Sequence, residues 1–219
     1  MKIQIITLFP EMFEGVLGNS MLWKASDRGI VQYQMVNLRD FGLGPRKTVD
    51  DTPYGGGDGM LLKPEPVIAA IEFAQSQIEP GRTAKVYLPT PRGAVYRQSD
   101  AKRLAASNED LIIVCPRYEG YDERIVAYVD ELFCIGNYVL TGGEVPAMVL
   151  IDSIVRLLPG VLGGEHSAEI ESFQQDDQNI EFPQYTRPEE FRGTKVPEVL
   201  LNGHHGEIAK WRASNSFKG

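Results

Sequence analysis

Apolar runs alternate with amphipathic stretches through the first 160 residues of the chain. Segments rich in β-branched and aromatic residues predict strands at 2–8, 30–38, 84–89, 111–115 and 131–135. Helical spacing of apolar positions predicts helices that begin near Pro10, Ser20, Pro64, Ser99 and Asp122, with Ser20 and Asp122 as caps. Strands that alternate with helices in this way predict an α/β fold with a parallel sheet.

A further helix is predicted from Glu144 to Leu158, where Pro159-Gly160 ends it. Apolar residues cover most of its circumference, so it must be buried in the core or against a second copy of the chain. Arg156, near its end, is the only Lys or Arg between Arg124 and Arg187.

Three loops follow predicted strands and should meet where a parallel sheet binds ligands: 90–93, 116–121 and 136–143. The first is expected to be a sharp turn. The third begins at Gly136 and ends with Thr141-Gly142-Gly143. Glycines let main-chain N–H and C=O groups approach a flat heterocycle such as adenine. The alternative is that two glycine turns simply join a strand to a helix.

A long segment without periodicity runs from Asp40 to Lys63 and includes Arg46 and Lys47. About 20 residues without secondary structure inside a compact domain usually have a function. The segment is not a Walker phosphate loop, because Lys47 precedes its glycines and no Gly-Lys-Ser/Thr follows them.

The composition is that of an ordinary globular protein of 219 residues, and the net charge of −8 argues against generic nucleic-acid binding. The chain has no run of about 18 apolar residues that would suggest a membrane span. Its apolar start, broken by Gln4 and Thr7, predicts a buried strand and not a signal peptide. Cys115 and Cys134 lack metal-ligand spacing and fit a reduced, cytoplasmic setting.

The charge pattern changes beyond residue 160. Six acidic residues and no Lys or Arg lie between Gly163 and Glu181, whereas six basic residues face four acidic ones from Phe182 onward. This pattern predicts a domain at 1–160, a flexible acidic linker at 161–182 and a small helical domain at 183–219.

Two or three short helices are expected in the small domain, within 186–193 and 196–217. Their core is predicted to contain Leu200, Leu201, Ile208 and Trp211. The adjacent residues His204 and His205 would point in different directions, so no metal site is predicted there.

Four motifs resemble those of the bacterial tRNA (guanine-N1)-methyltransferases that modify the guanosine 3′ of the anticodon, at tRNA position 37. The motifs are VDDTPYGGGDGM at 49–60, YLPTPRG at 87–93, CPRYEGYDER at 115–124 and CIGNYVLTGGEVPAM at 134–148. The resemblance implies a SPOUT fold, in which a deep C-terminal trefoil knot threads the segment from about Tyr87 to Met148, plus a small all-α C-terminal domain. It also implies a homodimer with active sites at the subunit interface.

The same resemblance implies S-adenosylmethionine as the methyl donor. The residues expected to bind it are Pro89, Thr90, Pro91, Pro116, Tyr118, Glu119, Gly120, Cys134, Ile135, Gly136, Asn137, Tyr138, Val139, Leu140, Thr141, Gly142, Gly143 and Pro146. Pro116 stands where the family often has Gly, and because proline has no N–H, only its carbonyl can make a main-chain contact.

Methylation of guanine N1 needs a carboxylate to remove the N1 proton and a cation to stabilise the charge that moves to the oxygen on C6. By position in the family's motifs, Arg156 matches the catalytic arginine, and Glu171 stands where the family has Asp as general base. Asp176 and Asp177 are alternative bases, because the segment before Pro183 is two residues longer than usual.

Contacts with tRNA are implied for the glycine-rich segment at Gly57 and Asp58 and for Glu181. Arg46 and Lys47 are hypothesised to contact tRNA phosphates. The linker that carries Glu171 is expected to become ordered when tRNA binds, and each site would take Arg156 or Glu171 from the partner chain.

Three other functions are alternatives to this one. A SPOUT methyltransferase could act on another RNA position or on a ribose hydroxyl, and a non-catalytic RNA-binding dimer could retain the same fold. A Rossmann-type dehydrogenase is excluded, because no Gly-x-Gly-x-x-Gly follows the first strand.

Overall fold

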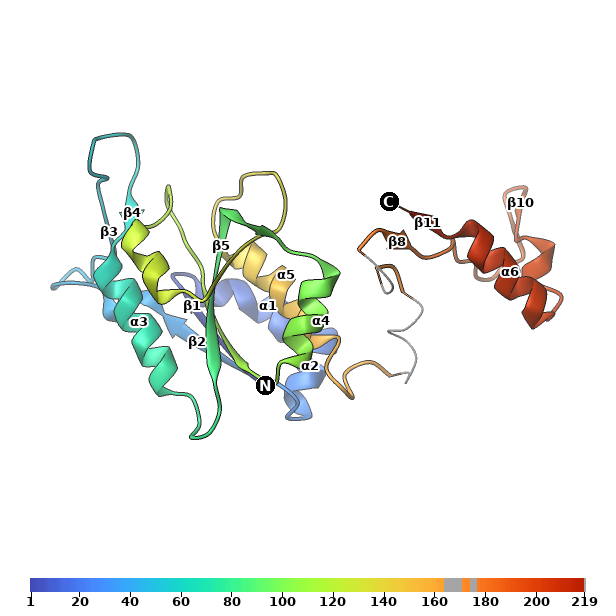
Figure 1. Cartoon of the computed structure of the whole chain (residues 1–219), viewed down its shortest axis with the longest axis horizontal. Helices are drawn as coiled ribbons and strands as arrows, with labels where there is room; N and C mark the ends of the chain where they lie inside the picture. The colour runs from blue at the N-terminus through green and yellow to red at the C-terminus, as the bar shows by residue number, and fades with distance from the viewer. Residues whose placement is uncertain (164–170, 174–176, 219) are drawn as a thin grey trace. The chain divides into compact units, whose positions relative to one another are not determined.

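The computed structural model describes residues 1–163, 171–173 and 177–218. The chain divides into two compact units, Met1–Leu162 and Gly163–Gly219, which are called unit 1 and unit 2 below (Figure 1). The expected acidic linker at 161–182 lies partly outside the described residues. The alternative base Asp176 lies outside them entirely.

Unit 1 is built on a five-stranded sheet whose neighbouring strands are all parallel, in the order β2-β1-β6-β5-β7. Its strands are β1 Lys2–Thr7, β2 Gln32–Asn37, β5 Ala84–Val95, β6 Asp110–Val114 and β7 Glu131–Cys134. Every residue of β6 is buried, as expected for a strand covered on both faces. The predicted α/β fold with a parallel sheet is therefore confirmed, and so are the five predicted strands.

Helices cover both faces of this sheet (Figure 1). They are α1 Glu14–Leu17, α2 Ser20–Asp27, α3 Pro64–Ser76, α4 Gln98–Ala106 and α5 Glu144–Val155, with the 3-10 helices η1 Pro10–Phe13, η2 Leu38–Phe41 and η3 Glu123–Tyr128. Side chains of β1 alternate between two cores. Ile3 and Ile5 pack with α1, α2, α4 and α5, whereas Ile6 packs with α3 and η3.

Residues 90–93 do not form the sharp turn that was predicted. They continue β5, and the pairing of β5 with β7 shifts register between Pro89 and Ala94. Gly93 makes this irregularity possible, because a Cβ there would lie only 2.6 Å from the carbonyl carbon of Leu132. The main chains of β5 and β7 thus approach each other where only glycine fits.

Three other local predictions for unit 1 need correction. The segment 40–63 is not without secondary structure, because β3 Asp50–Asp51 pairs with β4 Leu61–Leu62 in antiparallel fashion. Ser20 is not a cap; it is the first residue of α2, with φ of 53°, and Asn19 holds the cap position. Asp122 does cap the next element, by accepting a bond from the N–H of Arg124, but that element is a 3-10 helix that ends at Tyr128.

The predicted helix after Gly143 is confirmed as α5, although it ends at Val155 and not at Leu158. Within the described ranges, no helix reaches the length and hydrophobicity that crossing a bilayer would need.

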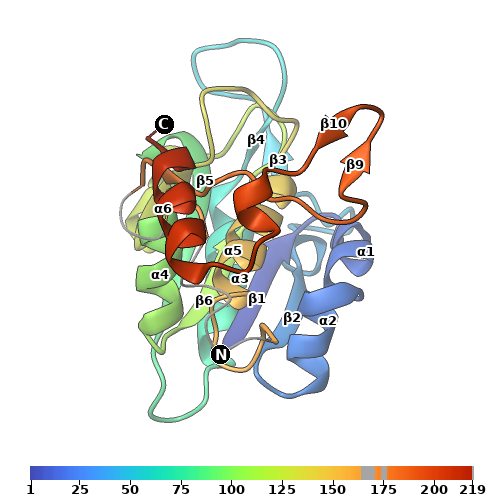
Figure 2. The same ribbon diagram turned by 90° about the vertical axis from the view of Figure 1, so that its right-hand side faces the viewer.

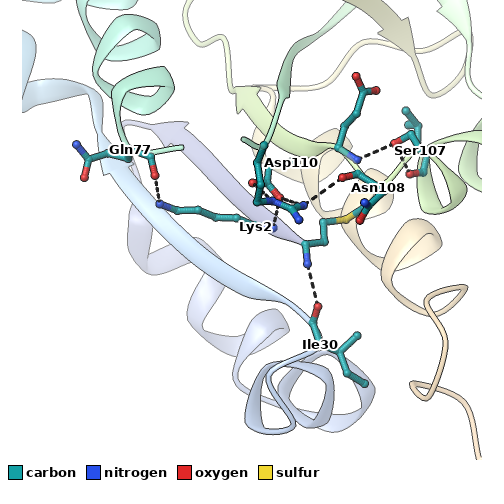
Figure 3. A network of polar contacts seen from close by, with 10 residues as sticks. Lys2, Ile30, Gln77, Ser107, Asn108 and Asp110 are labelled. Atoms are coloured by element: carbon teal, nitrogen blue, oxygen red, sulfur yellow. Dashed lines mark hydrogen bonds and ion pairs between the residues drawn. The ribbon is translucent and has the colours of Figure 1, made fainter. Parts of the chain in front are cut away.

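A polar network joins the starts of β1 and β6, at the edge of the sheet opposite the predicted ligand loops (Figure 3). Asp110 is 1% exposed and accepts bonds from the N–H of Lys2 at 2.7 Å and from the guanidinium of Arg82 at 2.6 and 2.9 Å. Lys2 Nζ donates to the carbonyl of Gln77 at 2.8 Å. Burial alone would raise the pKa of Asp110, but the bonds from Arg82 and Lys2 outweigh it and hold that pKa below its usual value.

Unit 2 contains η4 Glu198–Leu200, α6 His205–Asn215 and two short antiparallel pairs (Figures 1 and 2). The pairs are β8 Asn179–Ile180 with β11 Phe217–Lys218, and β9 Glu190–Phe191 with β10 Thr194–Lys195. The helices predicted within 196–217 are confirmed, but the one predicted at 186–193 is wrong. Arg192 and Gly193 both have positive φ, 51° and 81°, which makes a two-residue hairpin turn there.

Trp211 belongs to the small core of unit 2, as predicted. Its ring centroid lies 6.4 Å from that of Phe182 and 6.2 Å from that of Tyr185. Leu201 was wrongly placed in this core, since it is 47% exposed. Phe182 and Tyr185 lie before the predicted helix at 186–193. Local periodicity gives no link between them and α6.

Candidate active site

A cavity of about 410 Å³ opens beside residues 89–92 of β5 and at the carboxyl ends of β6 and β7. A volume of this size suits a small-molecule ligand. Its walls are formed by Leu61, Pro89, Thr90, Pro91, Arg92, Pro116, Arg117, Tyr118, Glu119, Gly120, Tyr121, Phe133, Cys134, Ile135, Gly136, Tyr138, Val139, Leu140, Gly142, Gly143 and Pro146. The two loops predicted after β6 and β7 thus converge on one cavity with residues 89–92, which belong to β5 and not to a separate loop.

Most residues predicted to bind the methyl donor line this cavity; the exceptions are Asn137 and Thr141, which belong to the same loop. Five further residues line the cavity but are not among those predicted from the sequence: Leu61, Arg92, Arg117, Tyr121 and Phe133. Arg92, Arg117 and Tyr121 lie inside the quoted motifs and could have been found there. Leu61 gave no local signal, because it reaches the wall through the pairing of its neighbour Leu62 with Tyr121.

Gly143 brings the loop after β7 against the loop after β6. Its N–H donates to the carbonyl of Pro116 at 2.8 Å. A Cβ on Gly143 would lie 2.8 Å from the Cα of Cys115, so only glycine allows this approach. The carbonyl of Pro116 is therefore already bonded within the protein.

Tyr138 folds back over the beginning of the loop after β7. Its hydroxyl donates to the carbonyl of Ile135 at 3.0 Å, and its N–H donates to the carbonyl of Gly136 at 3.0 Å. Gly136 has φ of 153°, and a Cβ there would lie 2.9 Å from Cζ of the tyrosine ring. The thiol of Cys134 donates to the same Gly136 carbonyl at 3.1 Å. The main chain of this loop is thus tightly folded without side-chain bulk.

The glycine-rich segment before β4 is joined to the cavity wall by main-chain hydrogen bonds. The N–H of Glu119 donates to Met60 and that of Leu62 donates to Gly120, each at 3.0 Å. Burial and the nearby charge of Asp50 raise the pKa of Tyr118, which lies in the same wall. The segment that contains Gly57 and Asp58 is therefore a neighbour of the cavity.

Charged side chains of the cavity wall are Arg92, Arg117 and Glu119. The guanidinium of Arg92 is paired with the carboxylate of Glu123. Cys115, next to the wall, is fully buried, and burial together with the charge of Glu144 raises the pKa of its thiol well above its usual value. We therefore expect this thiol to be unreactive.

Arg156 is not part of the cavity lining among the described residues. It follows the last turn of α5, whereas Pro146 in the first turn lines the cavity. Ten residues of helix separate the two, which is about 15 Å along the axis. Arg156 is thus far from the cavity of its own chain.

The predicted carboxylates lie in unit 2. Glu171 and Asp177 are both partly buried there. Glu181 donates its N–H to Ser172 Oγ at 3.1 Å and accepts a bond from Gln184 Nε2 at 3.0 Å. In unit 1, Arg46 and Lys47 are exposed, and Lys47 Nζ lies 3.1 Å from Asp40.

The model of the family described as tRNA (Guanine-1)-methyltransferase TrmD matches residues 1–218. The chain belongs to this family. Two similar curated proteins are both named tRNA (guanine-N(1)-)-methyltransferase. The one from Brevibacillus brevis is 52% identical and the one from Geobacter sulfurreducens is 51% identical, each over 219 residues that cover 100% of this chain and 87% of the relative.

A solved structure of a similar protein supports the same family assignment. It is titled tRNA (m1G37) methyltransferase from Aquifex aeolicus, and it superposes with a TM-score of 0.78 at 36% sequence identity, covering 96% of this chain and 87% of that chain. Members of the family are enzymes that methylate guanine N1 in tRNA, with S-adenosylmethionine as the methyl donor. The glycine-rich walls and aromatic residues of the cavity fit a nucleoside with a flat base.

Proposed function

We propose that this chain methylates N1 of the guanosine at tRNA position 37 and takes the methyl group from S-adenosylmethionine. The observation that supports this most strongly is the convergence of residues 89–92 of β5 and the loops after β6 and β7 on one glycine-walled cavity. All three segments carry motifs of the family to which the chain belongs.

The donor would be held mainly by main chain. The loop from Ile135 to Leu140 would read the adenine ring, with Thr90, Pro91 and the 118–120 segment completing the cavity walls. Asn137 and Thr141 would shape the loop from outside the cavity lining. When bound, the donor supplies a methyl group on a positively charged sulfur.

Removal of the N1 proton is the task left to the protein. Glu171 would accept that proton, and Arg156 would stabilise the negative charge that moves to the oxygen on C6. Asp177 is the alternative base among the described residues, and Asp176 is the alternative outside them. A carboxylate works here only when it is placed within hydrogen-bond reach of N1.

We further propose a homodimer in which each active site uses residues of both chains. Arg156 lies about 15 Å along α5 from the cavity of its own chain, so a partner's Arg156 would have to complete the site. Val145 and Val149 of α5 are 46% and 41% exposed in the isolated chain, which supports a second copy as their cover.

The remaining expectations follow from the family. The segment from about Tyr87 to Met148 would form a trefoil knot. Two observations support this: β5 lies between β6 and β7 in the sheet, and the N–H of Gly143 donates to the carbonyl of Pro116. The two cysteines are free, which suits the reducing cytoplasm.

Contacts with tRNA would come from both units. In unit 1, Arg46 and Lys47 would bind phosphates, and Gly57 and Asp58 would lie near the target nucleotide. In unit 2, Glu181 would contact the neighbouring guanosine.

Methyl transfer to tRNA transcripts tests this proposal. We expect a transcript with guanosine at position 37 to gain one methyl group, identified as 1-methylguanosine by mass spectrometry of the nucleosides. Transcripts with adenosine or inosine at that position measure the dependence on the base, and the adenosine transcript should remain unmodified. Methylation of a ribose, or of another nucleotide in all transcripts, would instead support the alternative SPOUT activity. Absence of both donor binding and methyl transfer would support a non-catalytic RNA-binding role.

A further inference from the structure

Arg117 and Glu144 form a buried ion pair beside the cavity. Glu144, the first residue of α5, is 1% exposed, and its Oε2 lies 2.8 Å from Arg117 Nε. The alignment is that of an ion pair and not of a hydrogen bond. The other oxygen, Oε1, accepts a bond from Thr7 Oγ at 2.8 Å. These contacts connect the end of β1, the loop after β6 and the start of α5.

The guanidinium of Arg117 also reaches the loop after β7. Its Nη1 donates to the carbonyl of Thr141 at 3.3 Å. A Cβ on Gly142 would lie 2.6 Å from Arg117 Cδ and would overlap Nε, so the glycine allows the arginine to cross the loop. The guanidinium carbon lies 4.5 Å from the ring centroid of Phe9, and Nη2 lies 3.0 Å from Met12 Sδ. Arg117 is thus fixed on several sides.

We propose that Arg117 and Glu144 are positioning residues for the methyl-donor site. They fix the turn at Thr141–Gly143, which ends the loop after β7. Under the proposed function, on which this inference rests, the main chain of that loop holds the donor. Arg117 and Gly142 both line the cavity, whereas Glu144 is not part of its lining and acts through Arg117. Neither charged group is assigned a proton transfer.

A merely structural ion pair would have different consequences. Removal of one partner leaves an unpaired buried charge, which destabilises a fold whether or not the pair serves the site. Removal of both charges relieves that penalty. If the pair only stabilises the fold, the double variant should recover donor binding along with stability. If the pair positions the turn, stability should recover while donor binding stays weak.

The test uses the full chain with Arg117→Met, Glu144→Gln and the double variant. Titration calorimetry measures affinity for S-adenosylmethionine, thermal unfolding measures stability, and methyl transfer gives KM for donor and for tRNA. Misplacement of a binding group by a fraction of an ångström is expected to weaken donor affinity by about tenfold or more in all three variants. The KM for tRNA should stay near that of the wild type. The melting temperature of the double variant should exceed those of both single variants.

Arg117→Lys provides a conservative comparison. It keeps a positive charge to pair with Glu144 but loses the guanidinium Nη1 that donates to the carbonyl of Thr141. We expect it to retain stability better than Arg117→Met and still to bind donor more weakly than the wild type. Full donor affinity in Arg117→Lys would overturn the role assigned to the contact with Thr141.

The buried pair of Arg82 and Asp110 is the matched control. It lies in the same unit at the opposite edge of the sheet, and Asp110 is as buried as Glu144. Arg82→Met should lower the melting temperature but keep donor affinity within roughly twofold, since distant sites act independently. An equal loss of donor affinity in Arg82→Met and Arg117→Met would overturn the inference. Full recovery of donor affinity in the Arg117→Met, Glu144→Gln double variant would overturn it as well. Absence of donor binding in the wild type would overturn the proposed function itself.

Discussion

Glu119 lies against Gly59, so that a side chain from the cavity wall packs on the glycine-rich segment before β4. A Cβ on Gly59 would overlap Glu119 Cγ and would lie 3.1 Å from Oε1. Gly59 has φ of 84°, a backbone conformation that favours glycine. The segment proposed to contact the target nucleotide is therefore fitted around a carboxylate that lines the cavity.

Gly59→Ala should reduce methyl transfer, because the new methyl group forces Glu119 to move. We expect kcat/KM to fall by about tenfold or more. Gly56→Ala is the matched control: its φ of 81° gives similar backbone strain, but nothing lies within 4 Å of its Cβ position. Steady-state kinetics with donor and tRNA measure both variants. Similar losses in the two would show that backbone strain, and not displacement of Glu119, is responsible.

The double substitution Arg46→Ala and Lys47→Ala should weaken tRNA binding and reduce its dependence on salt. Each lost phosphate contact lowers the slope of log affinity against log salt by about 0.7 to 0.9, so two contacts lower it by about 1.5. Filter binding at several salt concentrations measures this slope. Lys85→Ala, which removes an ion pair with Glu109 near the start of β5, should leave the slope unchanged. An unchanged slope in the double variant would remove both residues from the interface.

Shared active sites predict rescue in mixed dimers. Arg156→Ala and Glu171→Ala homodimers should each lose about a hundredfold or more in kcat, because a transition-state cation or a general base is missing. A dimer with one chain of each kind contains one intact site and should recover up to half of the wild-type rate. No rescue would mean that each chain builds its own site. If Glu171→Ala alone stays active, Asp177→Ala becomes the test of the base.

Stability in acid should depend on Asp110. Its pKa is held below the usual value in the folded chain, so its carboxylate stabilises the fold above the unfolded-state pKa of about 3.9, and this contribution is lost as pH falls through the folded pKa. Asp110→Asn should cost about 2 kcal/mol near neutral pH and should flatten the acid decline in unfolding free energy. Urea denaturation from about pH 6 to pH 3 measures this. Asp40→Asn, which breaks an exposed pair with Lys47, should change little. An acid decline as steep in Asp110→Asn as in the wild type would contradict the assignment.

Much of unit 1 could be predicted because its signals are local. Most strands of the five-stranded sheet contain a short apolar run, most clearly β6. The glycine positions of the loops indicate where main chain approaches a ligand. The same local signal existed for the β9–β10 hairpin, where Arg192-Gly193 separates two short strands.

Long-range relationships could not be predicted in this way. The bulge in β5 depends on Gly93 meeting β7, about 40 residues later in the chain. The partners of Glu144 are Arg117 and Thr7, and an acidic residue at a helix start looks like an exposed group that favours the helix dipole. Only the packing of β1, β6 and α5 around it shows that this carboxylate is buried.

Calorimetric titration with S-adenosylmethionine tests most directly whether the glycine-walled cavity is the donor site. The proteins compared are the wild type, Gly142→Ala and Gly206→Ala. A Cβ on Gly142 would collide with Arg117 in the cavity wall, whereas nothing lies within 4 Å of the Cβ position of Gly206 in α6. The wild type and Gly206→Ala should bind the donor equally, and Gly142→Ala should bind about tenfold more weakly or worse. Absence of binding heat in the wild type, or equal affinity in all three proteins, would contradict the account.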